Sequence, residues 1–378
     1  MKNNFSANCG WIIKISLSLL ALILTARFSV PLSVLADSGL GLLIIREEQE
    51  VKTEKNTASP VTYTEVTEKS TAKATEKEKK EEESSIGSFY NTPEDVKDFS
   101  AEYLEAHKSS AVSGSTMEVF FRTSGATDNV MGLSVKNSTS DKKPDFEALL
   151  EEGPDLSIED KAQPTVLIYH THTTETYLLA DNGVFYEDYP ARSTDSRKNM
   201  LRVGEEICRV LEENGIGFIH DKNVYDESYE GAYSRSRVTV EKYLEEYPTI
   251  QIVLDVHRDA IYYSDSEHAK PTAEIEGRKA AQIMIITGAE DGYITDFPNW
   301  ENNLRFSLLF QKTAEEIATG LMKPIYFCQR KYNMDLGKCS VLLETGTDAN
   351  TLDEALYSGY LTGRVLTEIV NEYEKKQK

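Results

Sequence analysis

Histidine and glutamate side chains follow three apolar runs of this 378-residue chain, each at the point where the run ends. His170, His172 and Glu175 come after the run TVLIY, His257 follows IQIVLDV, and Glu344 follows SVLL. Imidazole and carboxylate groups are the ligands of open zinc sites, which keep one position for water. If the three runs are neighbouring strands, this spacing predicts a metal site where they end.

Each of these residues has a candidate role in such a site. His172, Glu175 and His257 are the candidate zinc ligands, and His170 is an alternative to His172 that the residues alone do not resolve. Glu344 is the candidate proton carrier, because an unligated carboxylate is needed to take a proton from water and pass it to a leaving amine. A single histidine at a strand end is more often structural. The prediction of a metal site therefore depends on histidine and glutamate residues occurring together at three strand ends.

Arg258, which follows His257 directly, is a second candidate catalytic residue. Its guanidinium could polarise a scissile carbonyl or bind a substrate carboxylate. The structural alternative is an ion pair with Asp255 or Asp259 beside it.

The elements that must position these residues can be predicted from the pattern beyond residue 163. Continuous apolar runs are typical of strands buried on both faces. Helical periodicity separates them at 198–214, 237–247, 304–322 and 352–373. The alternation predicts an α/β fold, with a mostly parallel sheet and helices on both faces. Ligands of such sheets bind outside the carboxyl ends of the strands, where the histidines lie.

Four regions follow one another along the chain. Residues 1–45 contain an apolar segment that favours an uncleaved, single membrane anchor, with a cleaved signal peptide as the alternative. Residues 46–97 are rich in Thr, Glu and Lys and predict a disordered tether. Residues 98–162 form a lead-in region, and 163–378 form the catalytic domain.

The formal net charge is −22, and almost all of it, −20, falls from Asp98 onward. A chain this acidic lacks the clustered cations of a sequence-independent nucleic-acid binder, so we expect no nucleic-acid partner. The four cysteines, Cys9, Cys208, Cys328 and Cys339, form no C-x-x-C pair. Buried free thiols are favoured over a bridge between Cys328 and Cys339.

Three stretches resemble the stage II sporulation protein P family, namely VLIYHTHTTETY, SRSRVTVEKYLEEYPTIQIVLDVHRDA and CSVLLETGTDANTLDEA. The resemblance covers roughly residues 116–373. It implies a membrane-anchored peptidoglycan hydrolase that works outside the cytoplasm with Zn²⁺ as its cofactor. It also implies a fold similar to that of zinc-dependent N-acetylmuramoyl-L-alanine amidases and zinc carboxypeptidases (phosphorylase/hydrolase-like).

The reaction implied by the resemblance is cleavage of the amide between the lactyl group of N-acetylmuramic acid and the stem-peptide L-alanine. Endopeptidase action on peptide cross-links is implied as well. The implied partners are peptidoglycan, the transglycosylase stage II sporulation protein D and membrane proteins of the forespore engulfment machinery.

Carrying the amidase pattern onto this chain places the first ligand at His172. The carboxylate ligand of the pattern falls near Ser196, which cannot serve, so Glu175 is its substitute and gives an H-x-x-E arrangement like that of zinc carboxypeptidases. His257 and Glu344 follow both patterns. Two other functions stay open: a zinc carboxypeptidase that trims stem peptides, and a non-catalytic, membrane-tethered scaffold that binds the cell wall.

Overall fold

The computed structural model describes residues 90–188 and 190–375. The predicted anchor at 1–45 lies outside the described residues, and so does most of the predicted tether at 46–97. Along the part of the chain that is described, no helix is both long enough and apolar enough to cross a bilayer.

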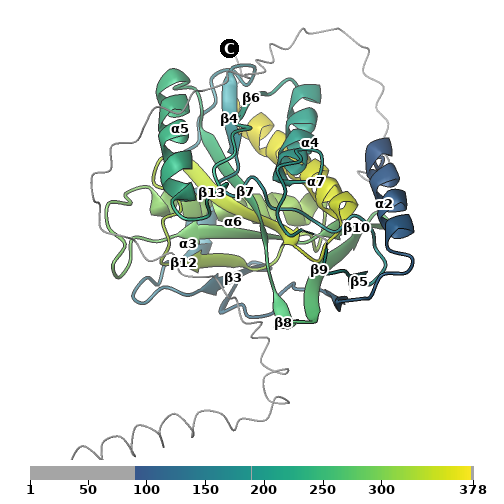
Figure 1. Cartoon of the computed structure of the whole chain (residues 1–378). Coiled ribbons are helices and arrows are strands. Elements are labelled where there is room, and N and C mark those ends of the chain that lie inside the picture. Colours follow the sequence, from purple (N-terminus) through teal and green to yellow (C-terminus); the bar gives the residue numbers. More distant parts are fainter. Residues whose placement is uncertain (1–89, 189, 376–378) are drawn as a thin grey trace, which may run out of the picture. The chain divides into compact units, whose positions relative to one another are not determined.

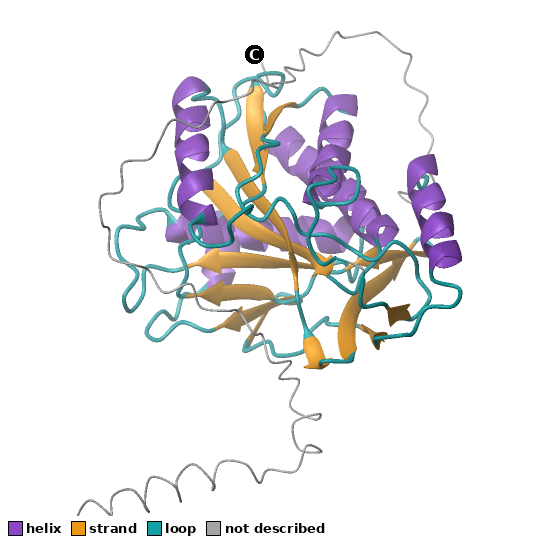
Figure 2. Ribbon diagram, in the orientation of Figure 1, coloured by secondary structure: helices purple, strands orange, loops and turns teal. Residues whose placement is uncertain are grey.

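Eight strands form the main sheet, in the order β2-β3-β12-β11-β13-β7-β4-β6 (Figures 1 and 2). Their bounds are β2 Asp128–Val130, β3 Leu133–Asn137, β4 Pro164–Tyr169, β6 Gly217–His220, β7 Ile252–Asp259, β11 Ile283–Gly288, β12 Ile325–Cys328 and β13 Cys339–Thr347. Strands β13, β7, β4 and β6 are parallel, and so are β11, β12 and β3. Because β11 pairs antiparallel with β13, these two groups run in opposite directions. The predicted mostly parallel sheet is confirmed, but only the β13-β7-β4-β6 group ends at the edge that holds the histidines.

Helices cover both faces of this sheet, as the sequence predicts. Their bounds are α4 Met200–Glu213, α5 Ala232–Glu246, α6 Trp300–Ile317 and α7 Leu352–Tyr373. On one face Val240 of α5 packs against Leu167 of β4 and Val253 of β7. Apolar side chains of α4, α6 and α7 pack on the opposite face. Figure 1 shows α5 on the other side of β4 and β7 from α4 and α7.

The three cysteines among the described residues are Cys208, Cys328 and Cys339, and all three are free and buried. The prediction of buried thiols is therefore confirmed, and the alternative bridge between Cys328 and Cys339 is not formed.

A second, smaller sheet lies beside the main one, and the sequence did not predict it. Its strand order is β10-β9-β1-β5, and β8 also pairs with β9. The bounds are β1 Gly114–Val119, β5 Val184–Phe185, β8 Tyr262–Ser264, β9 Glu267–Ile275 and β10 Arg278–Ala281. Two further helices are α2 Glu94–Ala106 and α3 Phe146–Glu152. Residues 98–162 thus supply β1 to the second sheet, β2 and β3 to the main sheet, and α3.

A buried lysine joins the second sheet to α7. Lys270 of β9 is 1% exposed, and its Nζ lies 2.6 Å from Asp181 Oδ1 and 2.8 Å from Glu354 Oε1. Glu118 of β1 lies 3.4 Å from the same amine. Glu354 also accepts a hydrogen bond from the backbone N–H of Thr351 and completes the capping box of α7. One cation therefore fixes the start of α7 against β9.

Substituting Lys270 tests this connection. We expect Lys270→Met to lower the free energy of unfolding by about 3–5 kcal/mol, because it leaves the buried Glu354 without a counter-charge. The measurement is urea unfolding followed by circular dichroism. Lys279→Met is the matched control, since Lys279 is half-exposed and pairs with the same Glu118 and Asp181. It should cost no more than about 1 kcal/mol, and equal losses for the two variants would contradict the expectation.

Candidate metal and proton-transfer site

Four of the predicted site residues lie together at the carboxyl ends of β4, β7 and β13. Glu344 of β13 is the register partner of His257 on β7, so their side chains are neighbours on one face. The ring of His172, just beyond β4, lies 5.2 Å from the ring of His257, centre to centre, at an angle of 86°. Glu175 Oε2 lies 3.8 Å from His257 Nδ1. The structure thus brings two imidazoles and two carboxylates to one sheet edge.

The ring of His257 is oriented by Asp255, two residues earlier on β7. His257 Nε2 lies 2.7 Å from Asp255 Oδ1. Asp255 in turn accepts hydrogen bonds from the backbone N–H and the hydroxyl of Thr171, at 2.9 and 2.7 Å. Burial lowers the pKa of His257, but the charge of Asp255 outweighs it and raises this pKa to about 9. Metal-binding histidines commonly have such a carboxylate on the ring nitrogen that faces away from the ion.

His172 offers a buried nitrogen to the site. Its ring stacks on Tyr229, with centres 4.7 Å apart and planes 8° apart, and meets the edge of Tyr233. Its Nδ1 has no hydrogen-bond partner among the described residues, and Asp226 Oδ2 lies 3.9 Å away. Burial, reinforced by the positive charge of His257, lowers the pKa of His172 to about 3. The ring is therefore neutral at physiological pH, which is the form that binds metal ions.

Glu175 is held between two arginines. Its Oε1 lies 3.4 Å from a guanidinium nitrogen of Arg192, and its Oε2 accepts a hydrogen bond from the backbone N–H of Arg258 at 3.2 Å. Arg192 also pairs with Asp226 at 2.5 Å, and Asp226 accepts a hydrogen bond from the hydroxyl of Thr174 at 2.7 Å. Arg192 and Asp226 are parts of the site that the sequence did not reveal, because they come from coil segments without a recognisable pattern.

Glu344 lies half-buried beside these groups. Its Oε2 has no hydrogen-bond partner in the described part of the chain. Burial and the nearby negative charges of Asp259 and Glu175 outweigh the positive charge of His257 and raise the pKa of Glu344 to about 8. A carboxyl group with this pKa can both take up and release a proton near neutral pH.

His170, the alternative ligand, faces the other side of the sheet. Its Nδ1 lies 2.9 Å from the carbonyl oxygen of Val256, and its Nε2 lies 3.0 Å from Nε2 of His220. Both histidine side chains press against Gly204 of α4. Since both ring nitrogens of His170 have protein partners, the structure does not place this residue with His172 and His257.

Arg258 lies beside the site with its guanidinium directed to backbone carbonyls. It donates hydrogen bonds to the carbonyl oxygens of Thr176 at 3.2 Å and Ala191 at 2.9 Å. Its side chain is buried. The contact with Asp259 goes to that residue's backbone oxygen rather than its carboxylate. In this structure Arg258 therefore joins β7 to the segments that carry Glu175 and Arg192.

Within residues 90–188 and 190–375, no three His, Cys, Asp or Glu side chains stand close enough to hold a metal ion as they are arranged. In this arrangement Glu175 pairs with Arg192, and the ring of His172 stacks on Tyr229. The donor types still match a zinc site, and Nδ1 of His172 is buried without a hydrogen-bond partner among the described residues.

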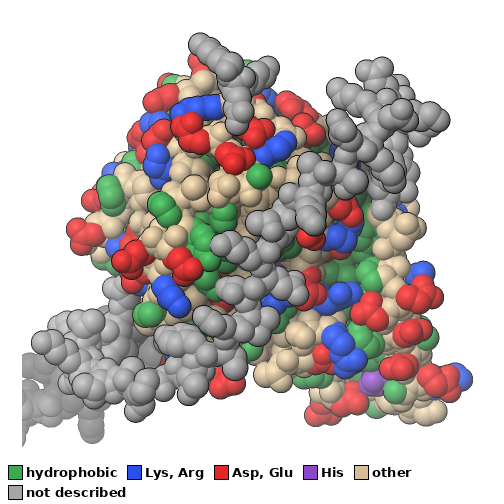
Figure 3. Space-filling model, turned by 90° about the horizontal axis from the view of Figure 1, so that it is seen from above, with side chains coloured by type: hydrophobic (Ala, Val, Ile, Leu, Met, Phe, Trp, Pro, Cys, Tyr) green, Lys and Arg blue, Asp and Glu red, His purple; other side chains and the backbone are tan. Residues whose placement is uncertain are grey.

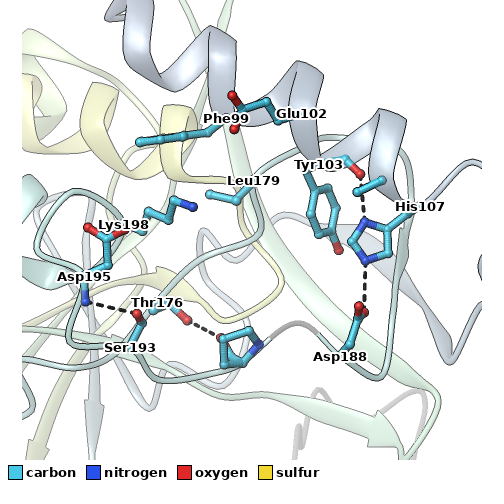
Figure 4. Close-up of a pocket in the computed structure, with 12 residues that line it drawn as sticks. Phe99, Glu102, Tyr103, His107, Thr176, Leu179, Asp188, Ser193, Asp195 and Lys198 are labelled. Carbon is cyan, nitrogen blue, oxygen red and sulfur yellow. Dashed lines mark hydrogen bonds and ion pairs between the residues drawn. The ribbon is translucent and has the colours of Figure 1, made fainter.

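A separate cavity of about 340 Å³ lies between α2 and the segment 188–198 (Figure 4). It is lined by Phe99, Tyr103 and His107 of the α2 region, and by Asp188 and Lys198 opposite them. His107 bridges its two sides, with one ring nitrogen 3.0 Å from Asp188. The metal-site residues do not line this cavity, so it is not the candidate reaction site.

The charged side chains on the described surface are mixed in sign. In the view of Figure 3, acidic side chains are spread over the molecule with Lys and Arg between them. This distribution agrees with the acidic composition and offers no large basic face in that view.

Comparison with known proteins identifies the family. The family model of stage II sporulation protein P (SpoIIP) matches residues 31–367. The chain belongs to this family. Stage II sporulation protein P of Bacillus subtilis (strain 168) is 29% identical over 222 residues, which are 56% of this chain and 52% of that protein. The match thus spans about half the length of this relative.

Two solved amidases show a distant structural similarity to this SpoIIP-family chain. N-acetylmuramoyl-L-alanine amidase AmiC2 of Nostoc punctiforme is 10% identical, with a TM-score of 0.33 and coverage of 57% of this chain and 98% of that one. The CwlD amidase from Clostridioides difficile, in complex with the GerS lipoprotein, is 12% identical, with a TM-score of 0.35 and coverage of 55% and 98%. Similarity at this level establishes nothing about the site.

The packing of His170 can be tested from α4. A Cβ atom at position 204 would lie 2.5 Å from His220 Nε2 and 2.6 Å from His170 Nε2. Gly204→Ala is therefore expected to lower the free energy of unfolding by about 1–3 kcal/mol, measured by urea unfolding. Adding His220→Ala should restore part of the loss, because it makes room for the methyl group. No loss in the single variant would show that the two rings are not packed in this way.

Glu344 should also affect stability in a pH-dependent way. The folded state keeps the Glu344 proton up to about pH 8, whereas a glutamate of ordinary pKa 4.5 in the unfolded chain releases it earlier. The stability contributed by Glu344 therefore falls as pH rises from about 4.5 to 8. In metal-free protein, Glu344→Gln should be more stable than wild type at pH 8 by about 1–3 kcal/mol, with a smaller difference at lower pH.

Denaturant unfolding between pH 5 and 8, in the presence of a chelator, measures this difference. Glu147→Gln, on the exposed side of α3, is the matched control and should stay within about 0.5 kcal/mol of wild type at each pH. A Glu344→Gln variant that is less stable than wild type at pH 8 would contradict the expectation.

Proposed function

We propose that the chain is a zinc-dependent peptidoglycan hydrolase, an N-acetylmuramoyl-L-alanine amidase that also cleaves peptide cross-links. The observation that carries the proposal is the meeting of His172, Glu175 and His257 with the proton-accepting Glu344 at one sheet edge. Membership in the stage II sporulation protein P family supports a role in sporulation, and the proposal assigns that role to forespore engulfment.

His172, Glu175 and His257 would hold the zinc ion. Two imidazoles and one carboxylate are the donor set of catalytic zinc sites with an open position, and binding would displace the proton that Asp255 favours on His257. When bound, zinc supplies Lewis acidity toward a carbonyl oxygen and toward water. Asp255 keeps the Nε2 side of His257 occupied, so that Nδ1 faces Glu175 and the open side of the cluster.

Glu344 would move the proton in this reaction. Its carboxylate accepts a proton from the attacking water and delivers it to the nitrogen that leaves with the stem peptide. The position beside Asp259 and Glu175 supports this role, because a pKa raised to about 8 makes the Glu344 carboxylate a stronger base toward water than an ordinary glutamate. Thr171 and Asp255 would be positioning residues, because they act by fixing the ring of His257.

The proposal also includes a location and partners. The apolar segment in residues 1–45 would anchor the protein in the cell membrane, and the 46–97 segment would carry the catalytic domain to the wall outside the cytoplasm. Peptidoglycan is the substrate, and the transglycosylase stage II sporulation protein D with membrane proteins of the engulfment machinery would be its partners.

The test is muropeptide release from purified sacculi by the full-length protein, analysed by mass spectrometry. We expect sugar chains with free lactyl groups, loss of activity with a chelator, and recovery with zinc. His257→Ala and Glu344→Gln should each lower the rate by about 100-fold or more. His107→Gln, whose ring contacts Tyr103 and Asp188 and none of the cluster residues, is the matched control and should keep its activity.

Each alternative gives a different result in this assay. Shortened stem peptides with intact lactyl amides would identify a carboxypeptidase. Folded protein that binds sacculi but releases nothing would identify a scaffold. Zinc content of the purified protein, measured by mass spectrometry of the metal, tests the ligand set separately and should fall in His172→Ala.

A further inference from the structure

The loop 329–338, between β12 and β13, is tied by hydrogen bonds to the residues that orient His257. Asn333 Nδ2 donates to Ser236 Oγ at 3.1 Å and to the carbonyl oxygen of Tyr233 at 3.0 Å. Ser236 Oγ bonds the hydroxyl of Thr171 at 2.8 Å, and that hydroxyl donates to Asp255. A continuous series of hydrogen bonds thus connects the loop to the site.

The same loop is fixed to its surroundings at a second point and holds an unusual backbone. Asp335 forms a two-bond ion pair with Arg237 of α5, with both distances at 2.9 Å. Tyr332 and Asn333 have φ angles of 42° and 58°, in the left-handed region that side chains with a Cβ atom rarely adopt. Such strain persists only where the surroundings enforce it, and it is concentrated at binding and catalytic sites.

Aromatic rings lead from the site to this loop. The ring of Tyr233 is stacked toward His257, with centres 6.3 Å apart and planes 10° apart. Tyr332 also stacks on Tyr233, with centres 5.0 Å apart and planes 26° apart. The strained backbone of Tyr332 therefore fixes the position of its ring. This ring follows that of Tyr233 in the row that begins at His257.

Arg330 stands at the outer end of this row of rings. It donates a hydrogen bond to the hydroxyl of Tyr293 at 2.7 Å and to the carbonyl oxygen of Gln329 at 3.2 Å. No carboxylate of the described residues forms an ion pair with it, and it is only partly buried. In a chain with 63 acidic residues against 41 basic ones, such an arginine is available for an external carboxylate.

We infer that Arg330 and the rings of Tyr233 and Tyr332 form a subsite for the stem peptide, in which Arg330 binds a peptide carboxylate. The inference rests on the proposed function. Within peptidoglycan, the sugars around the scissile amide are N-acetylated and neutral, and the carboxylates belong to the peptide. A guanidinium binds a carboxylate with two parallel hydrogen bonds. It therefore selects for both the negative charge and the orientation of the carboxylate. The peptide side of the substrate then lies over the loop 329–338.

The test compares two soluble muropeptides that differ only in one group: a free α-carboxylate on the second stem residue, or its amide. The full-length protein hydrolyses both, and initial rates give kcat and KM. Wild type should favour the carboxylate form by about 10- to 100-fold in kcat/KM, mainly through KM. Arg330→Gln should lose this preference, because KM for the carboxylate form rises far more than KM for the amidated form.

Two further variants separate charge from structure. Arg330→Lys should recover only part of the preference, since an ammonium group cannot make the paired hydrogen bonds. Arg122→Gln removes a surface arginine that pairs with Glu315, and it should behave as wild type. Unfolding curves should show the same stability for Arg330→Gln and Arg122→Gln within about 0.5 kcal/mol.

The outcomes distinguish failure of the proposed subsite from failure of the proposed function. An active wild type with the same preference in Arg330→Gln overturns the subsite and leaves the hydrolase proposal standing. Equal loss on both muropeptides also overturns it, since it would mean a general structural role. A zinc-loaded wild type that cleaves neither muropeptide nor sacculi overturns the proposed function, and the subsite with it.

Discussion

The candidate site depends on one buried carboxylate, that of Asp255. It accepts two hydrogen bonds from Thr171, beyond β4, while lying 2.7 Å from the ring of His257 on its own strand. A carboxylate with 1% exposure is stable only if it is fully bonded and paired, so its presence dictates where the end of β4 and the ring of His257 must stand. The hydrogen bonds through Thr171 and Ser236 extend the same constraint to α5 and to the loop 329–338.

Around Asp255 the carboxylates of the sheet edge lie beside positively charged partners. Asp259 has Lys323 at 3.1 Å, Glu175 and Asp226 share Arg192, and Asp255 has His257. Among the described residues Glu344 has no such partner for its Oε2 and instead shifts its pKa upward. A divalent cation bound at this edge would lower the pKa of the Glu344 carboxyl, so the proposed zinc site and the proposed proton carrier are electrostatically linked.

The sequence was informative where burial imposed a pattern. β4, β7, β12 and β13 each contain a short apolar run, and α7 matches its predicted range of 352–373 because Thr351 and Glu354 form a capping box at its start. The second sheet was missed because β5 and β8 are two and three residues long and its strands are partly polar. The direction of β11 was not predictable either, since an apolar run does not show whether its strand pairs parallel or antiparallel with its neighbour.

Within the site, the sequence identified the residues on strands better than their partners on loops. His257 and Glu344 are register neighbours because both end apolar runs, whereas Arg192 and Asp226 reach Glu175 from coil segments and left no periodic signal. His170 and His172 could not be separated by spacing alone. The contact of His170 with His220, on the α4 face, separates them.

The order of the strands has a consequence for how the protein is made. β13 occupies the middle of the main sheet, yet it follows β4 and β7 along the chain, and α7, the most buried helix, follows it in turn. A polypeptide that emerges N-terminus first from the ribosome or from an export channel therefore exposes β4 and β7 before β13. At that stage the central strand of the sheet has not yet emerged. Glu344 arrives on that last strand. The strand that closes the hydrophobic core is thus the strand that carries Glu344, and a partly emerged chain has neither.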